Sequence, residues 1–187
     1  MNQKEIIQRC KQNDYTAQLV VYTNYKDMLY NSCVRLLKNR EDAEDVVHDA
    51  FIKGFQKVNQ LSDEMHIGAW FRRIAINLSL DKIRKEKKNV WIDNSKELVA
   101  EVTEIEFEEA EAYSVANIKK SMLELKEKYS IILTLYLIED YTHKEIAFML
   151  GLNESTVRNQ YRRGKKQLKE RLEKQQEDEF KRVHTAS

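Results

Sequence analysis

The chain has 187 residues, a length that suits one ordinary domain or two small ones. It contains 42% hydrophobic and 34% charged residues, no proline and only four glycines, which favours helices and offers few turn signals for a β-sheet protein. No apolar run approaches the roughly 18 residues of a membrane span, and the N-terminus lacks the apolar core of a secretion signal. We therefore expect an all-α, cytoplasmic protein without membrane insertion, in which Cys10 and Cys33 are reduced.

The net charge of +1 conceals a strong segmental pattern. Residues 1–88 carry a net charge of +4, residues 89–127 carry −6, residues 128–175 carry +4, and residues 176–187 carry −1. The electrostatic field that a phosphate backbone meets is local. Two basic segments can therefore contact a polyanion although the chain as a whole is nearly neutral.

Three amphipathic helices are expected in the N-terminal half, over residues 15–38, 39–58 and 67–88. The apolar positions of the first are Leu19, Tyr22, Leu29, Cys33, Leu36 and Leu37. Those of the second are Val47, Phe51, Phe55 and Val58. Those of the third are Trp70, Ile74, Leu78 and Ile83. Together these stripes predict a small helical bundle.

Periodicity fades between residues 89 and 112, where "ELVAEVTEIEFEEAEA" holds seven glutamates and no cation. This composition is typical of an extended acidic linker. A second helical block begins near Tyr113, and "KYSIILTLYLIED" within it is apolar on nearly all sides, as a buried helix is. Thr142 and Glu145 have the spacing of a capping box, and Gly151 is expected to end the helix that follows.

The last helix, with Asn153 as its expected N-cap, has two chemically distinct faces. At about 100° per residue, its apolar face carries Val157, Tyr161, Gly164, Leu168 and Leu172. Its opposite face carries Ser155, Asn159, Arg162, Arg163 and Lys166, with Arg158 on the flank nearest the helix start. In a helix-turn-helix the second helix enters the major groove, where Arg suits guanine and Asn suits adenine. The pattern favours DNA binding over a merely solvated basic face.

Two further segments carry charge in a pattern that admits two interpretations. The run "EDAEDVVHD" either complements the dipole of a helix start or docks onto a basic protein surface, and its composition does not decide between them. The third helix places Trp70 and Phe71 beside Arg72 and Arg73, a combination that suits single-stranded nucleic acid. Taken alone, however, Trp70 fits better as a core residue.

The sequence shows no nucleophile–base pair, glycine-rich phosphate loop or metal cluster. The four histidines lie apart without ligand spacing. We therefore expect neither catalysis nor a cofactor or metal.

Three segments, in this order, resemble the sigma-70 family of bacterial sigma factors, in its small extracytoplasmic-function (ECF) group. "DAEDVVHDAFIKGF" resembles the helix that binds core RNA polymerase, and "AWFRRIAINLSLDKIRK" resembles the segment that melts and reads the −10 element. "LKEKYSIILTLYLIEDYTHKEIAFMLGLNESTVRNQYRRGKKQLKERL" resembles the domain that binds the −35 element. Three motifs in the order of the family, over about residues 15–175, are more specific than a single helix-turn-helix.

The resemblance implies a role for each matching position. Core polymerase is expected to be contacted at its β′ clamp helices and also at its β subunit. The residues expected to meet the clamp helices are Asp42, Glu44, Asp45, His48 and Asp49. The residues expected at the melted −10 element are Trp70, Arg73, Asn77, Asp81 and Arg84. The residues expected at the −35 element are Ser155, Thr156, Arg158, Asn159, Arg162, Arg163 and Lys166. Gly164 departs from the alanine that is common in the family.

The resemblance also implies an organisation and partners. Residues 1–88 would form the polymerase-binding and −10 domain, residues 89–112 the acidic linker, residues 113–175 the −35 domain and residues 176–187 a tail. In the family the linker runs through the polymerase cleft. Expected partners are core RNA polymerase and promoter DNA, with an anti-sigma factor as a further candidate. The alternative function is a helix-turn-helix regulator that is not a polymerase subunit.

Overall fold

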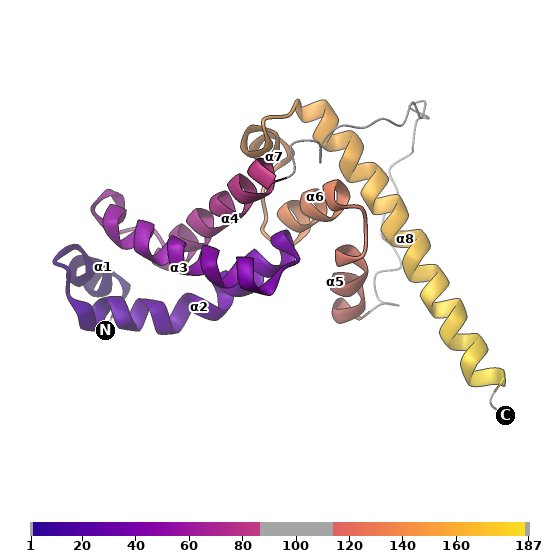
Figure 1. Cartoon of the computed structure of the whole chain (residues 1–187), viewed down its shortest axis with the longest axis horizontal. Coiled ribbons are helices and arrows are strands. Elements are labelled where there is room, and N and C mark those ends of the chain that lie inside the picture. Colours follow the sequence, from indigo (N-terminus) through magenta and orange to yellow (C-terminus); the bar gives the residue numbers. More distant parts are fainter. Residues whose placement is uncertain (1, 87–113, 186–187) are drawn as a thin grey trace. The chain divides into compact units, whose positions relative to one another are not determined.

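Helices account for the regular structure of the chain (Figure 1). The computed structural model describes residues 2–86 and 114–185, and no β-strand occurs among them. Contacts divide the chain into an N-terminal unit, Met1–Lys88, and a C-terminal unit, Asn89–Ser187. The all-α prediction is thus confirmed, whereas the predicted acidic linker over residues 89–112 lies outside the described residues.

The N-terminal unit is a bundle in which α2, α3 and α4 all pack against one another (Figure 1). Its elements are α1 (Gln3–Lys11), α2 (Tyr15–Leu37), α3 (Arg40–Lys57), the 3-10 helix η1 (Val58–Gln60) and α4 (Ile67–Glu86). Asp14 caps α2 and Asn39 caps α3, each by accepting hydrogen bonds from backbone N–H groups of the first turn. Local sequence signals therefore set the starts of α2 and α3, and apolar faces hold the three helices together.

Aromatic side chains fill the place where α3 meets α4. Phe71 is fully buried, and its ring centroid lies 5.1 Å from those of both Phe51 and Phe55. Gly54 lies against the same ring, where its lack of a Cβ allows the close approach of α3 to α4. The ring of Phe71 is therefore enclosed by neighbours on the facing helix.

The first helix, α1, is an element that the sequence pattern did not predict. Its Gln8 and Lys11 side chains donate to the Asp63 carboxylate at 2.6 and 2.9 Å, and its Gln3 side chain donates to the Met65 carbonyl oxygen at 2.9 Å. The hydrogen bonds from Lys11 and Gln8 hold the pKa of Asp63 below its usual value. The helix thus anchors the segment between η1 and α4 by side-chain contacts between residues more than 50 positions apart.

The apolar stripes predicted for α2 and α4 need correction. Leu19 is 47% exposed, and Ala17 and Val21 are buried instead near the start of α2. On α4, Trp70, Ile74 and Leu78 are only half-buried. The buried positions of α4 are Ile67, Gly68, Phe71, Ala75, Ile76, Ser79, Leu80 and Ile83. Small residues allow close packing on this face, and a count of large apolar residues gives them too little weight.

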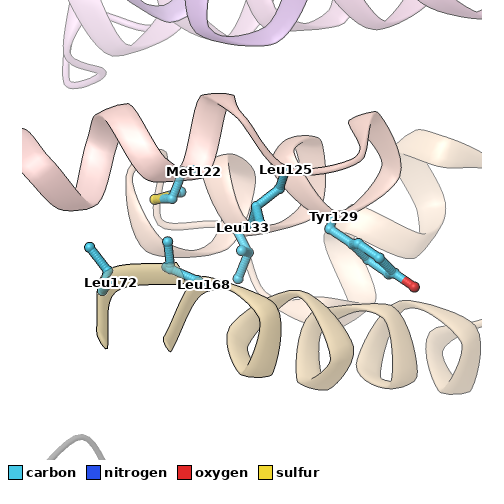
Figure 2. Packing of buried hydrophobic residues seen from close by; sticks show 6 residues of the cluster. All are labelled: Met122, Leu125, Tyr129, Leu133, Leu168 and Leu172. Atoms are coloured by element: carbon cyan, nitrogen blue, oxygen red, sulfur yellow. The ribbon is translucent and has the colours of Figure 1, made fainter. Parts of the chain in front are cut away.

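The C-terminal unit consists of α5 (Val115–Leu123), α6 (Glu127–Leu137), α7 (His143–Leu150) and α8 (Glu154–Thr185). Helix α6 is buried over nearly its whole length, as its apolar sequence predicts. Figure 2 shows the cluster through which α8 meets the first two helices of the unit. Its members are Met122, Leu125, Tyr129, Leu133, Leu168 and Leu172. The predicted apolar face of α8 is thus confirmed, since Val157, Leu168 and Leu172 are at most 1% exposed.

Helix α8 continues beyond the part that packs on the bundle. Arg171 pairs with Glu124, and the Ser121 hydroxyl donates to the Gln175 side chain at 3.1 Å, so α5 covers α8 as far as residue 175. The helix then runs on to Thr185 without a break. The segment expected as a separate tail, residues 176–187, therefore begins as a continuation of the same helix.

Candidate functional site

A helix-turn-helix is built from α7, the turn at Gly151 and the start of α8. Thr142 caps α7 as predicted: its Oγ1 accepts from the Glu145 N–H at 3.2 Å, while the Glu145 carboxylate accepts from the Thr142 N–H at 2.9 Å. Gly151 ends α7 in the left-handed conformation with φ of 66°. Asn153 directly precedes α8, and its carbonyl oxygen accepts from the Val157 N–H. Each boundary of the motif follows from a local sequence signal.

The residues predicted to read the −35 element lie on the outward side of α8. Ser155, Arg158, Asn159, Arg162 and Lys166 are exposed. Thr156 and Arg163 are half-buried on the flanks of that face. The structure thus brings all seven together on the first turns of one helix, opposite its buried face. They form what we call the basic face of α8.

Glu154, at the start of α8, belongs to this face, although the sequence interpretation did not include it. Its Oε1 accepts from Arg158 Nε at 3.1 Å and from Arg158 Nη2 at 2.6 Å. Further along the helix, Lys166 lies 3.9 Å from Glu170. Both pairs have i,i+4 spacing, the signal in the sequence that could have identified Glu154.

An aromatic cluster lies beside the basic face. The ring of His143 stacks on Tyr136 at 4.4 Å and meets Tyr161 edge-on at 4.9 Å. Burial lowers the pKa of His143, and the nearby charges of Arg158 and Arg162 lower it further, while Glu154 acts in the opposite direction. The neutral form of His143 is therefore favoured, and its ring links α6, α7 and α8.

The residues predicted at the −10 element share one side of α4, opposite its buried face. Arg73, Asn77 and Arg84 are exposed, and Asp81 forms an ion pair with Arg84. Trp70 is half-buried and meets the fully buried Phe71 edge-on, with ring centroids 5.2 Å apart. Trp70 is thus not a core residue. Its ring packs on the buried Phe71 ring, and part of its surface remains exposed to solvent.

Four of the five residues predicted to contact core polymerase share the exposed side of α3. Glu44, Asp45, His48 and Asp49 are exposed and line one hollow. A second hollow shares Glu44 and His48 and extends over α2. Its lining there consists of Tyr22, Lys26, Asp27 and Tyr30. These α2 residues were not predicted as site residues, because only the packing of α2 against α3 brings them beside the acidic run. We call the whole surface the α2–α3 groove.

Asp42 differs from the other members of the acidic run. Its carboxylate lies 2.7 Å from the Lys82 ammonium of α4, and both side chains are 27% exposed. This contact raises the pKa of Lys82. The ion pair joins α3 to α4, so Asp42 has an internal partner at the edge of the α2–α3 groove.

Other kinds of site find no support among the described residues. No group of three or more His, Cys, Asp or Glu side chains that could hold a metal ion occurs there. Cys10 and Cys33 are buried and are not joined in a disulfide, and burial raises the pKa of Cys10 to about 11. Within the same residues, no helix is both long and apolar enough to cross a membrane.

Both helical units match parts of one protein family. The family model for sigma-70 region 2 matches residues 21–89, and the model for sigma-70 region 4 matches residues 116–168. Among similar proteins, the ECF RNA polymerase sigma factor SigW of Bacillus subtilis is 28% identical over 179 residues, which cover 90% of this chain and 96% of SigW. The RNA polymerase sigma factor SigV of the same organism is 27% identical over 166 residues, covering 88% of this chain and 96% of SigV.

Solved structures share the fold. The sigma factor RpoE from Bartonella quintana, in complex with the anti-sigma factor NepR, superposes with a TM-score of 0.52 at 20% identity, over 81% of this chain and 94% of RpoE. CnrH, in complex with the cytosolic domain of CnrY, superposes with a TM-score of 0.54 at 18% identity, over 91% of this chain and 97% of CnrH.

A match to both regions in order distinguishes the two functions that the sequence left open. A helix-turn-helix regulator outside polymerase requires only the second of these regions, whereas the relatives match along nearly their whole length. Sigma factors are transcription initiation factors. The chain belongs to the sigma-70 family, in the ECF group, and it directs RNA polymerase to promoters.

Proposed function

We propose that each of the two units makes one promoter contact and that the N-terminal unit also docks on core polymerase. In this assignment the basic face of α8 reads the −35 element, the outward side of α4 holds the melted −10 strand, and the α2–α3 groove meets the β′ clamp helices, with the β subunit as a further contact. The observation that carries the proposal is the basic face of α8, which presents Arg and Asn side chains on a capped helix-turn-helix.

Base reading at −35 rests on the chemistry of the first turns of α8. Arg158 and Asn159 are exposed near the helix start, the part of a recognition helix that meets base edges. An Arg contact with guanine O6 and N7, or an Asn contact with adenine N6 and N7, is worth about 1–3 kcal/mol of discrimination. Lys166 lies farther along the helix, where phosphates are the nearer partners. Base specificity therefore depends on the first two turns of α8. The cations that follow fix the position of the helix along the DNA.

Strand capture at −10 rests on Trp70 and its neighbours. Extruding a base from the duplex costs a few kcal/mol, which stacking and backbone contacts must offset. Trp70 offers a ring face that Phe71 supports, and Arg73 is an exposed cation on the same side of α4. Asn77 adds a donor and an acceptor for a base edge. This set is suited to an unstacked strand because it combines one aromatic platform with adjacent positive charge.

Polymerase docking rests on the separation of charge within the N-terminal unit. Glu44, Asp45 and Asp49 are exposed in the groove and outnumber Lys26, a cation that also lines it, whereas Arg73 and Arg84 belong to α4. A basic protein surface fits the α2–α3 groove, and DNA phosphates do not. Asp42 joins the contact from the edge of the groove while it also holds α4 through Lys82.

Several further features follow from the family assignment. The chain performs no catalysis itself and acts in the cytoplasm, where polymerase is. Residues 89–112 act as the acidic linker between the two promoter contacts. An anti-sigma factor is a candidate regulator, because the similar structure of RpoE holds the anti-sigma factor NepR.

Reconstitution with core polymerase and a promoter library tests the proposal. We expect specific initiation that requires the full chain. Arg158→Ala should relax base discrimination at −35 and leave affinity for core polymerase unchanged. Replacing Glu44, Asp45 and Asp49 by their amides should weaken core binding without changing which promoters are preferred. A protein that fails to bind core polymerase, or an Arg158→Ala variant that loses core affinity while it keeps −35 discrimination, would contradict these assignments.

A further inference from the structure

Glu154 is an anionic residue in the first turn of a helix that faces a polyanion. Its carboxylate is 39% exposed, and it lies on the same outward side as Arg158, which is 60% exposed. A carboxylate here repels DNA phosphates and weakens binding to every sequence alike. Its ordinary explanation is a favourable interaction with the helix dipole, together with an exposed i,i+4 ion pair of small stabilising effect.

The geometry of the contact with Arg158 is more specific than this explanation requires. Both hydrogen bonds, from Nε at 3.1 Å and from Nη2 at 2.6 Å, end on the single oxygen Oε1. A guanidinium has five N–H donors in one plane. Binding through the Nε–Nη2 edge leaves the Nη1–Nη2 edge, which is the fork that fits O6 and N7 of guanine. Glu154 therefore determines which edge of Arg158 is presented.

We propose that Glu154 is a specificity-determining residue of the −35 interface, which orients Arg158 for guanine and rejects unsuitable base edges beside it. This inference rests on the proposed role of α8 in reading −35. It assigns a function to a residue that would otherwise only weaken DNA binding.

Rejection follows from the charge of the carboxylate. Both hydrogen bonds to Arg158 use Oε1, so Oε2 is not occupied by this arginine. A carboxylate accepts from the N4 amino group of cytosine, but it is repelled by an edge that offers only acceptors, such as O6 and N7 of guanine or O4 of thymine. At the base next to the one that Arg158 reads, Glu154 thus favours a base that presents a hydrogen-bond donor. It disfavours a base whose edge presents only acceptors. Such unfavourable contacts with wrong sequences are an effective source of specificity.

Three variants separate this role from general electrostatics. Glu154→Gln removes the charge, and Glu154→Asp keeps the charge but shortens the side chain by one methylene, so that Nε and Nη2 of Arg158 no longer meet one carboxylate oxygen in the same geometry. Glu170→Gln is the matched control, because Glu170 forms an i,i+4 pair with Lys166 about three turns farther from the helix start. Each full-length variant is bound to core polymerase and presented with promoters randomised at −35, and bound templates are sequenced at low and high salt. Circular dichroism checks that helix content is unchanged.

We expect both Glu154 variants to reduce discrimination at the Arg158 base and its neighbour by about three- to tenfold, a fraction of what a bidentate Arg–guanine contact supplies. Glu154→Gln and Glu170→Gln should also raise affinity for all promoters at low salt, and this gain should shrink at high salt. Glu154→Asp should show the loss of discrimination without the gain in affinity.

Loss of the role of Glu154 and loss of the −35 role of α8 give different experimental results. If both Glu154 variants keep wild-type discrimination while Arg158→Ala loses it, α8 reads −35 but the role of Glu154 is overturned. If Arg158→Ala also keeps wild-type discrimination, the proposed function of α8 is overturned and the inference with it. A Glu154→Gln effect that is uniform over all promoters and equal to that of Glu170→Gln would likewise reduce Glu154 to a general electrostatic contribution.

Discussion

Gly54 offers a quantitative test of the packing beneath the residues that we propose to bind the −10 element. A Cβ added at this position would lie 2.7 Å from Cδ1 and 2.9 Å from Cζ of Phe71, and closer still to Cε1. The Phe71 ring cannot readily move away. It is fully buried, its centroid lies 5.1 Å from those of Phe51 and Phe55, and Trp70 meets it at 5.2 Å. Gly54→Ala must therefore push α3 and α4 apart or displace this ring.

The size of the effect is the balance of two terms. Overpacking a well-filled core with one methyl group costs about 1–3 kcal/mol, and the enclosed ring places this site near the upper end. Replacing glycine by alanine inside a helix returns about 1 kcal/mol of helix propensity. We expect a net loss of about 2 kcal/mol in the free energy of unfolding of the N-terminal unit. For a unit of this size, such a loss lowers Tm by about 8–16 °C.

Hydrogen exchange resolved by mass spectrometry is the suitable assay, because it reports the opening of each helix separately. Peptides from α3 and α4 should exchange faster in Gly54→Ala, while peptides from α6 and α8 serve as an internal reference. Gly164→Ala is the control substitution: its Cβ would lie 3.1 Å from Cβ of Tyr129 and 3.2 Å from Cδ1 of Leu133, so smaller shifts suffice. We expect this control within about 1 kcal/mol of wild type. A Gly54→Ala protein as stable as wild type would refute the enclosure of Phe71.

Two further predictions concern the C-terminal unit. Because the pKa of His143 is lowered in the folded state, the unfolded chain binds more protons as the pH falls below the ordinary pKa of histidine. Urea denaturation should therefore show lower stability of this unit at pH 5.5 than at pH 7.5, and His143→Gln should reduce that difference; a wild-type unit that is more stable at pH 5.5 would contradict the burial of a neutral ring. Thr142→Ala removes the capping-box acceptor for the Glu145 N–H, and it should destabilise the unit by about 1 kcal/mol. Thr142→Ser should recover most of this loss, and equal stability of all three proteins would show that the cap contributes nothing.

The sequence by itself determined the elements whose causes are local. The capping box of Thr142 and Glu145, the left-handed end at Gly151 and the two faces of α8 all depend on residues within a few positions of one another. They were therefore predicted with their residues, and the basic face of α8 with them. The same applies to the exposed acids of α3, because their spacing places them on the side of the helix opposite its apolar positions.

Only the tertiary structure decided which surfaces face each other. The pairing of Asp42 with Lys82, the anchoring of Asp63 by α1 and the place of Tyr22 and Tyr30 beside the acidic run each join residues distant in sequence. Periodicity identifies an apolar side, but it does not tell how much of that side a neighbouring helix covers. For this reason the stripe predicted through Trp70, rather than Phe71, was wrong as a core assignment. The error matters for function, since a half-buried ring supported by a buried one is accessible to a base and a fully buried ring is not.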